Sequence, residues 1–199
     1  MVSLEIHPLD FAYNTTVVSK KQFDEHMKLY HGYVDKTNAI SAQLANDGDR
    51  AGANATYSLY RGLKKGESYA LDGCLLHELY FQNLSDGKTP MGGATEALLK
   101  KQFGSVENWI ADCKACGLSA RGWCVLVYEQ RTETCRNLLL DLHNEGLVLG
   151  AYPLVVLDMY EHAYFLDYAT DKGAYIQSFI NGIHWGVVES RVKRIVNGA

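Results

Sequence analysis

The sequence predicts an α+β fold in which an N-terminal helical hairpin precedes a C-terminal α/β lobe with a three-stranded antiparallel sheet. Three observations predict it. Amphipathic runs of helical periodicity fill most of the first 84 residues, a Gly- and Pro-containing segment follows, and three apolar runs of β character come between residues 122 and 158. We therefore expect an N-terminal domain of residues 1–88 and a C-terminal domain of residues 89–199.

The first half of the chain contains the helices of the hairpin. Residues 19–44 predict a long helix, because Ser19 can cap its N-terminus and apolar or aromatic side chains recur at helical spacing from Phe23 onward. The segment NDGDRAGAN interrupts this pattern. Two further helices are predicted at residues 54–65 and 68–84, so the chain turns back on itself.

The second half alternates between helical and strand patterns. Because the connections between the three strands are short, we expect an antiparallel meander in which the strands pair in chain order. The predicted elements are helices at 94–103 and 106–116, strands at 122–130, 134–142 and 147–158, and helices at 160–169 and 172–196.

Composition narrows the class of protein. The chain has 199 residues, 47% of them apolar, which is enough to bury a full core. A net charge of -4 and the lack of any Lys/Arg-rich block predict no nucleic-acid partner, and the lack of a long apolar run predicts no membrane span. Five cysteines without an export signal are typical of reduced thiols, so we expect a cytoplasmic protein.

Cys113 and Cys116 form a CxxC pair, but no second pair completes a zinc site, and we interpret them as core or surface thiols.

Four ionisable residues occur in similar, apolar contexts. His26 and His77 each lie within a predicted helix among aromatic residues, and Asp158 and His162 are four residues apart at the end of the third strand. If the chain is helical from Asp158, that spacing brings both side chains to one face. Imidazole and carboxylate groups suit iron, manganese or zinc. From spacing alone, a buried Asp158–His162 hydrogen bond with unrelated roles for the other two histidines explains the pattern equally well.

Several motifs resemble those of the iron/manganese superoxide dismutases. The segment DMYEHAYFLDY resembles the D-x-W-E-H-A-Y-Y signature of that family, LLHELYF resembles its N-H-x-F-Y-W segment, and FDEHMKLYHGYV resembles its first-helix motif. Further similarity in FGSVENW, ARGWCVLVY and HWGVVESR extends the resemblance, in order, over nearly the whole chain.

The resemblance implies a metal centre and an activity. His26, His77, Asp158 and His162 would hold one iron or manganese ion per subunit, with one coordination position left for a water or hydroxide. The family converts two superoxide ions and two protons into dioxygen and hydrogen peroxide. The substrate would then be the superoxide anion, and the assembly a homodimer or homotetramer.

The resemblance also implies a residue that hydrogen-bonds the solvent ligand of the metal. Many iron enzymes of the family carry a Gln at the position of Gly73, one helical turn before His77. Here that position has no side chain, and His143 matches the alternative location, so we expect His143 to fill the space and orient the solvent. An exposed histidine at the end of a strand is the competing interpretation, because Asn144-Glu145-Gly146 predicts a turn.

Departures from the family pattern occur around the expected substrate entrance. Tyr160 replaces a Trp, and Tyr30 replaces the first histidine of a pair whose other member matches His31. Phe165 replaces the Tyr that bonds that first histidine across the dimer. Tyr33 comes seven residues after His26 instead of eight, but the i, i+4, i+7 spacing still directs it toward the same side of the helix.

Two more residues complete the expected site. The resemblance places Trp123 in the wall around the metal, and Glu161 would cross to the partner subunit and bond its equivalent histidine. Packing alone could account for Trp123, and a solvated position at a helix start could account for Glu161. The competing function is a non-catalytic metal-binding or structural scaffold derived from the same fold. A hydrolytic zinc enzyme ranks last, because no HExxH-type glutamate accompanies the histidines.

Overall fold

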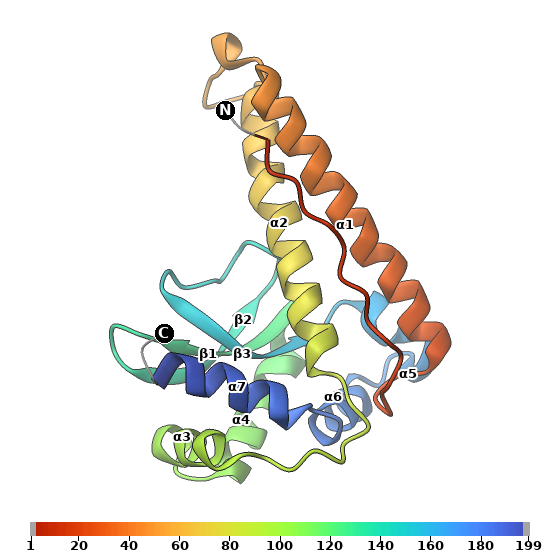
Figure 1. Cartoon of the computed structure of the whole chain (residues 1–199), viewed down its shortest axis with the longest axis vertical. Coiled ribbons are helices and arrows are strands. Elements are labelled where there is room, and N and C mark those ends of the chain that lie inside the picture. The colour runs from red at the N-terminus through yellow and green to blue at the C-terminus, as the bar shows by residue number, and fades with distance from the viewer. Residues whose placement is uncertain (1–2, 197–199) are drawn as a thin grey trace.

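A computed structural model describes residues 3–196, and it shows a long helical hairpin that projects from a lobe of helices and a small sheet (Figure 1). The hairpin consists of α1 (Lys20–Asn46), a 3-10 turn η1 (Arg50–Gly52) and α2 (Leu59–Asn83). The other lobe contains a three-stranded antiparallel sheet with helices around it. The predicted α+β class is therefore confirmed.

The hairpin begins as predicted but has fewer helices than expected. Ser19 caps α1 by accepting a hydrogen bond from the Gln22 amide. The two helices predicted at 54–65 and 68–84 are one continuous helix, α2. Gly66 lies within this helix, and a Cβ there would lie 3.2 Å from Ile40 Cδ1. This glycine allows α1 and α2 to approach closely.

The second lobe starts with two helices and the sheet. These elements are α3 (Gly93–Phe103), α4 (Val106–Ser119), β1 (Trp123–Glu129), β2 (Thr134–Leu140) and β3 (Ala151–Asp158). The strand order is β2-β1-β3, so the predicted meander is wrong: β3 pairs with β1, not with β2. β1 is central because it is apolar on both faces and its first five residues are buried, whereas β2 mixes buried and exposed positions as an edge strand does.

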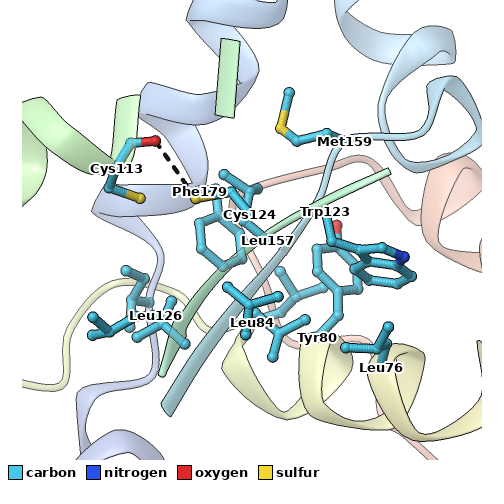
Figure 2. Packing of buried hydrophobic residues seen from close by; sticks show 14 of the residues in the cluster. Leu76, Tyr80, Leu84, Cys113, Trp123, Cys124, Leu126, Leu157, Met159 and Phe179 are labelled. Carbon is cyan, nitrogen blue, oxygen red and sulfur yellow. Dashed lines mark hydrogen bonds between the residues drawn. The ribbon is translucent and has the colours of Figure 1, made fainter. Parts of the chain in front are cut away.

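Strand β1 separates two layers of helix. Successive side chains of a strand point to opposite faces, so Trp123 and Cys124 face different layers. Trp123 meets His77 of α2, with ring centroids 5.1 Å apart, and Cys124 meets Cys113 of α4. Around this strand, Tyr80, Leu157 and Phe179 belong to the main hydrophobic core (Figure 2). The core thus joins the hairpin to the sheet.

The end of the chain is more broken than the sequence predicts. It contains η2 (Glu161–Ala163), α5 (Phe165–Tyr168), α6 (Lys172–Asn181) and α7 (Trp185–Val196). The helix predicted at 160–169 is a 3-10 turn followed by a single helical turn, and the one predicted at 172–196 is divided around Ile183, which forms a β-bridge with Leu84.

Among residues 3–196, the structure contains no helix whose length and apolar character would suffice to cross a membrane.

Candidate metal centre

Four side chains from both lobes converge on one point. His26 comes from α1, His77 from α2, Asp158 from the last position of β3 and His162 from η2. One potential ligand atom from each lies within 4.8 Å of the corresponding atoms of the other three. The structure thus brings together the four residues that the sequence singled out.

Asp158 and His162 meet for a reason other than the predicted one. They do not share a helix face, because Asp158 ends a strand and His162 lies in a 3-10 turn. The chain bends between them, and Asp158 Oδ1 accepts a hydrogen bond of 2.9 Å from the Tyr160 amide. This bond directs the other oxygen, Oδ2, toward the imidazoles.

Asp158 Oδ2 is the common neighbour of the three histidines. Its distances are 3.1 Å to His26 Nε2, 3.3 Å to His162 Nε2 and 3.6 Å to His77 Nε2. The Nε2 atoms of His26 and His77 are buried, and although Asp158 Oδ2 is close, neither nitrogen makes a hydrogen bond with it or with any other described residue. Buried polar atoms without a partner are rare and costly, and a bound cation would satisfy both. Three imidazole nitrogens and one carboxylate oxygen therefore fit an iron or manganese ion.

Burial sets the protonation of these ligands. It lowers the pKa of His26, and it lowers the pKa of His77 to about 3, so both imidazoles are neutral near pH 7. Burial acts to raise the pKa of Asp158, but the neighbouring His162 and His26 outweigh it and hold this pKa below its ordinary value. Neutral imidazoles and an ionised carboxylate are the forms that bind metal.

Helix α2 orients His77 through its own backbone. His77 Nδ1 lies 2.5 Å from the Gly73 carbonyl, which can only accept, so Nδ1 carries the proton and Nε2 presents a lone pair to the centre. A Cβ at Gly73 would lie 2.8 Å from Tyr33 Cδ1. The space beside Gly73 is therefore occupied by the ring of Tyr33, which stacks on His77, and not by His143 as expected.

A hydrogen-bonded chain runs from the sheet to Tyr33. Trp123 Nε1 donates to His143 Nδ1 over 3.0 Å, so the ring proton of His143 is on Nε2, which donates to the Tyr33 hydroxyl over 2.6 Å. His143 is fully buried, which excludes the exposed strand-end interpretation. Burial lowers the pKa of His143 to about 4 and raises the pKa of Tyr33.

The turn after His143 requires a glycine. Gly146 has a φ of +102°, and a Cβ there would lie 2.6 Å from the Leu139 carbonyl oxygen. This close approach folds the segment after β2 back on the strand and keeps His143 inside the protein.

Tyr160 and Tyr69 surround His143. The Tyr160 ring stacks on His162, with centroids 5.1 Å apart, and its hydroxyl donates to the Asp141 carbonyl. The resemblance implies a Trp at this position. The Tyr160 hydroxyl that stands in place of its indole N–H thus has a hydrogen-bond acceptor in the Asp141 carbonyl. Tyr69 lies 4.5 Å from His143 between ring centroids. Sequence reasoning missed it, although positions 69, 73 and 77 share one face of α2.

Gln22 is a second residue that sequence reasoning missed. Its buried side chain donates to the carbonyl of His162 over 2.5 Å and accepts from the Leu166 amide over 3.0 Å. It therefore connects α1 to the segment that carries the fourth ligand. Its position one helical turn before His26 is the signal that could have found it.

Three predicted residues lie outside this cluster. The Tyr30 hydroxyl accepts from the Leu9 amide and donates to Glu78, each over 2.8 Å, so it faces the N-terminal segment and α2. His31 is exposed on α1. Glu161 is exposed next to His162, in a surface hollow that Phe165 and Leu166 also line.

Fold and site together define a mononuclear metalloprotein with a three-histidine, one-aspartate centre shared between a helical hairpin and an α/β lobe. Comparison with known proteins agrees with this class. The family described as iron/manganese superoxide dismutases, C-terminal domain, matches residues 91–191.

Relatives match over nearly the whole chain. "Superoxide dismutase [Fe]" of Aquifex aeolicus is 38% identical over 187 residues, which cover 91% of this chain and 87% of the relative. "Superoxide dismutase [Mn] 1" of Halobacterium salinarum is 31% identical, with 93% and 92% covered. "Superoxide dismutase [Mn/Fe]" of Aeropyrum pernix is 30% identical, with 98% and 93% covered. The chain belongs to the iron/manganese superoxide dismutase family.

Proposed function

We propose that this protein is a superoxide dismutase that uses one iron or manganese ion per subunit. The observation that carries the proposal is the convergence of His26, His77, Asp158 and His162, with two buried imidazole nitrogens that lack any other partner. The intact ligand set and the family membership both support it.

The four residues act as ligands of the metal. When bound, the ion supplies one-electron redox chemistry, by which two superoxide ions and two protons yield one dioxygen and one hydrogen peroxide. The ligand set contains a single carboxylate, Asp158, which is ionised, and burial keeps the imidazoles of His26 and His77 neutral. A centre with so little negative charge stays cationic with a trivalent or divalent ion, which favours an anionic substrate.

Tyr33 and His143 control protons beside the centre. The Nε2–H of His143 already occupies a lone pair of the Tyr33 oxygen, so the proton of the Tyr33 hydroxyl remains free to be donated. Burial raises the pKa of Tyr33, so the hydroxyl keeps this proton near pH 7. Trp123 and Tyr160 fix the two sides of His143 and restrict water around it.

The deciding experiment combines metal analysis with a superoxide assay of iron-loaded and manganese-loaded protein. We expect about one ion per subunit and activity in at least one form. The variant Asp158→Ala, which removes the only carboxylate among the four ligands, should lose both the bound metal and the activity. Stoichiometric metal without activity in either form would instead favour the scaffold function.

The protein works as a homodimer or homotetramer. Phe165 and Leu166 support this assembly, because they expose 45% and 54% of their surface beside Glu161 and His162. Apolar side chains next to a charged group at the edge of a site are typical of a subunit interface. In this arrangement Glu161 and the exposed His31 face the partner subunit.

Residues 1–88 and 89–199 act as two domains that share the metal. The match of the C-terminal family to residues 91–191 supports this boundary. A cytoplasmic location is supported by five cysteines that are all free in the structure.

A further inference from the structure

Two backbone groups of β3 bond side chains instead of a neighbouring strand. The pairing of β3 with β1 skips Leu154, which is therefore the extra residue of a β-bulge, and its carbonyl accepts from Arg191 Nη1 over 2.8 Å. Two residues further on, the Val156 amide donates to Asn83 Oδ1 over 2.9 Å. Asn83 ends α2, and Arg191 belongs to α7. Side chains from two helices thus satisfy the backbone of the strand that ends in Asp158.

The Arg191 guanidinium also holds the end of α2. Nη1 donates to Asn83 Oδ1 over 3.2 Å, in addition to the Leu154 carbonyl. Nη2 donates to the Leu79 carbonyl over 3.3 Å and to Gln82 Oε1 over 2.9 Å. All four acceptors are neutral oxygens, three on α2 and one on β3. Because the guanidinium is planar and its N–H groups point in fixed directions, one side chain links the two elements rigidly.

Asn83 is present for its oxygen. Its side chain is fully buried, and its Nδ2 has no hydrogen-bond partner among the described residues. A buried amide without an acceptor is costly, and an apolar residue would avoid that cost. Oδ1, however, accepts from both Val156 and Arg191, so it joins β3, α2 and α7 at one atom. Burial lowers the pKa of Arg191 to about 10, so near pH 7 the guanidinium still carries all of its protons.

This link lies close to two of the metal ligands along the chain. Leu79 follows His77 by two residues in α2, about 3 Å along the helix axis. Val156 precedes Asp158 by two residues, roughly 7 Å along β3. Regular helix and strand bend little over such lengths, so a shift between the linked segments moves the ligands as well. The 3.6 Å between His77 Nε2 and Asp158 Oδ2 thus depends on how α2 is held against β3.

We propose that Arg191 and Asn83 act as one unit that positions the metal ligands, by fixing His77 on α2 relative to Asp158 on β3. Both residues act through the backbone of these two elements and not by contact with the ion. The inference rests on the proposed metal centre but not on turnover, because it concerns how firmly and in what geometry the ion is held.

Release of the metal to a chelator tests this role. Iron-loaded or manganese-loaded protein is incubated with excess EDTA at pH 7, far below the unfolding temperature of every variant. Metal loss and the visible absorption band of the trivalent ion are followed together. Arg191→Met keeps the length of the side chain but removes its N–H groups, and it should release the metal about 10-fold faster and shift the band. Arg194→Met changes an exposed arginine of the same helix and should alter neither.

A second variant tests whether the two residues form one unit. Asn83→Leu fills a similar space without an acceptor, so it should speed release and shift the band as Arg191→Met does, and it provides the test should Arg191→Met not fold. The double variant should release the metal no faster than the more severe single one, because residues of one network do not act additively. Effects that multiply in the double variant would show that the residues act independently, and would overturn the proposal.

Val192→Ala controls for a purely structural effect. Val192 is the next residue of α7 and exposes 1% of its surface, so its truncation weakens the core without touching the link. It should leave the release rate and the band unchanged. The proposal fails if Val192→Ala changes both as much as Arg191→Met at an equal loss of unfolding free energy, or if Arg191→Met and Asn83→Leu both keep the parental values. A protein that shows the expected release and band but no dismutase activity would refute only the proposed function.

Discussion

At the scale of single residues, His143 is the most informative side chain outside the ligands. It accepts from Trp123 and donates to Tyr33, so its removal breaks both bonds without touching a ligand. His143→Ala should keep about the full metal content and lower kcat by roughly 10- to 100-fold, the usual cost of losing a residue that orients a metal site. Metal analysis measures the metal content, and steady-state assays on the same sample measure kcat.

Two further variants make this prediction specific. His143→Gln should recover part of the loss, because a side-chain amide can both accept from Trp123 and donate to Tyr33. His7→Ala changes an exposed histidine and should have no effect. A kcat for His143→Ala equal to that of the parent would refute the role of His143.

The buried histidines also predict how the stability of the metal-free protein depends on pH. The folded pKa is about 3 for His77 and about 4 for His143, whereas an unfolded histidine titrates near 6.5. Below pH 6.5 the unfolded chain therefore binds protons that the native protein does not. The free energy of unfolding is greatest above pH 6.5 and should fall by about 1.4 kcal/mol per pH unit for each of these histidines.

Urea unfolding of metal-free protein at pH 7, 6 and 5 measures this slope. The variant His143→Gln lacks one of these titrating groups, so its slope should be shallower. An unfolding free energy that stays constant between pH 7 and pH 5 would contradict the prediction.

The sequence predicted the ligands better than it predicted the groups around them. Residue types and spacing only made His26, His77, Asp158 and His162 candidates, and the resemblance of three motifs to the family selected them as one ligand set. Tyr69 and Gln22 were missed because tyrosine and glutamine are common on helices, and only their tertiary contacts with His143 and His162 distinguish them. Tyr30 shows the reverse, since the motif placed it at the site, whereas its hydroxyl bonds Glu78 and the Leu9 amide.

At the scale of elements, two glycines of α2 offer a matched comparison. A Cβ at Gly73 would lie 2.8 Å from Tyr33 Cδ1, whereas a Cβ at Gly62 would have nothing within 4 Å. Gly73→Ala should push Tyr33 off His77, cost about 1–3 kcal/mol of stability as an overpacked core does, and lower kcat. Gly62→Ala should instead stabilise the protein by about 0.4–1 kcal/mol through the unfolded state.

Denaturant unfolding and activity assays on the two variants test this contrast. Equal stability changes in both would show that Tyr33 moves aside without cost. A stable Gly73→Ala variant of normal kcat would show that the exact position of Tyr33 does not matter for turnover.

Helix and strand patterns predicted most elements, and the errors have physical causes. The gap predicted between residues 65 and 68 is helical, and Gly66 within it permits the close contact with Ile40. The aromatic run after Asp158 looked helical, but the Tyr160 amide is bound by Asp158 and the chain turns there. The strand order was mispredicted because short connections outweighed a better signal, the unbroken apolar run of β1 that marks a central strand.

At the scale of the whole molecule, the predicted subunit interface can be tested by a charge on its apolar edge. Phe165→Glu places a carboxylate next to Glu161 and should shift the assembly toward monomers, because a buried unpaired charge is costly. Leu149→Glu alters a side chain that is 99% exposed on the β2–β3 connection and should leave a dimer intact. Light scattering coupled to gel filtration measures both masses.

The two substitutions also separate the possible assemblies. A tetramer that Leu149→Glu reduces to a dimer would place a second interface at the β2–β3 connection. A Phe165→Glu protein with the parental mass would show that Phe165 and Leu166 face solvent, and the proposed interface would be wrong.

The burial of the metal centre determines when the protein can acquire its ion. His26, His77 and Asp158 expose at most 2% of their surface, and they come from α1, α2 and the sheet. The His162 side chain is 26% exposed, but the other three ligands lie where the hairpin packs against the lobe, so we expect an ion to exchange mainly when these parts separate. Exchange is then as slow as that opening, so the ion found in a mature subunit records which metal was abundant while the chain was folding. Later changes in the cellular supply would alter only newly made copies.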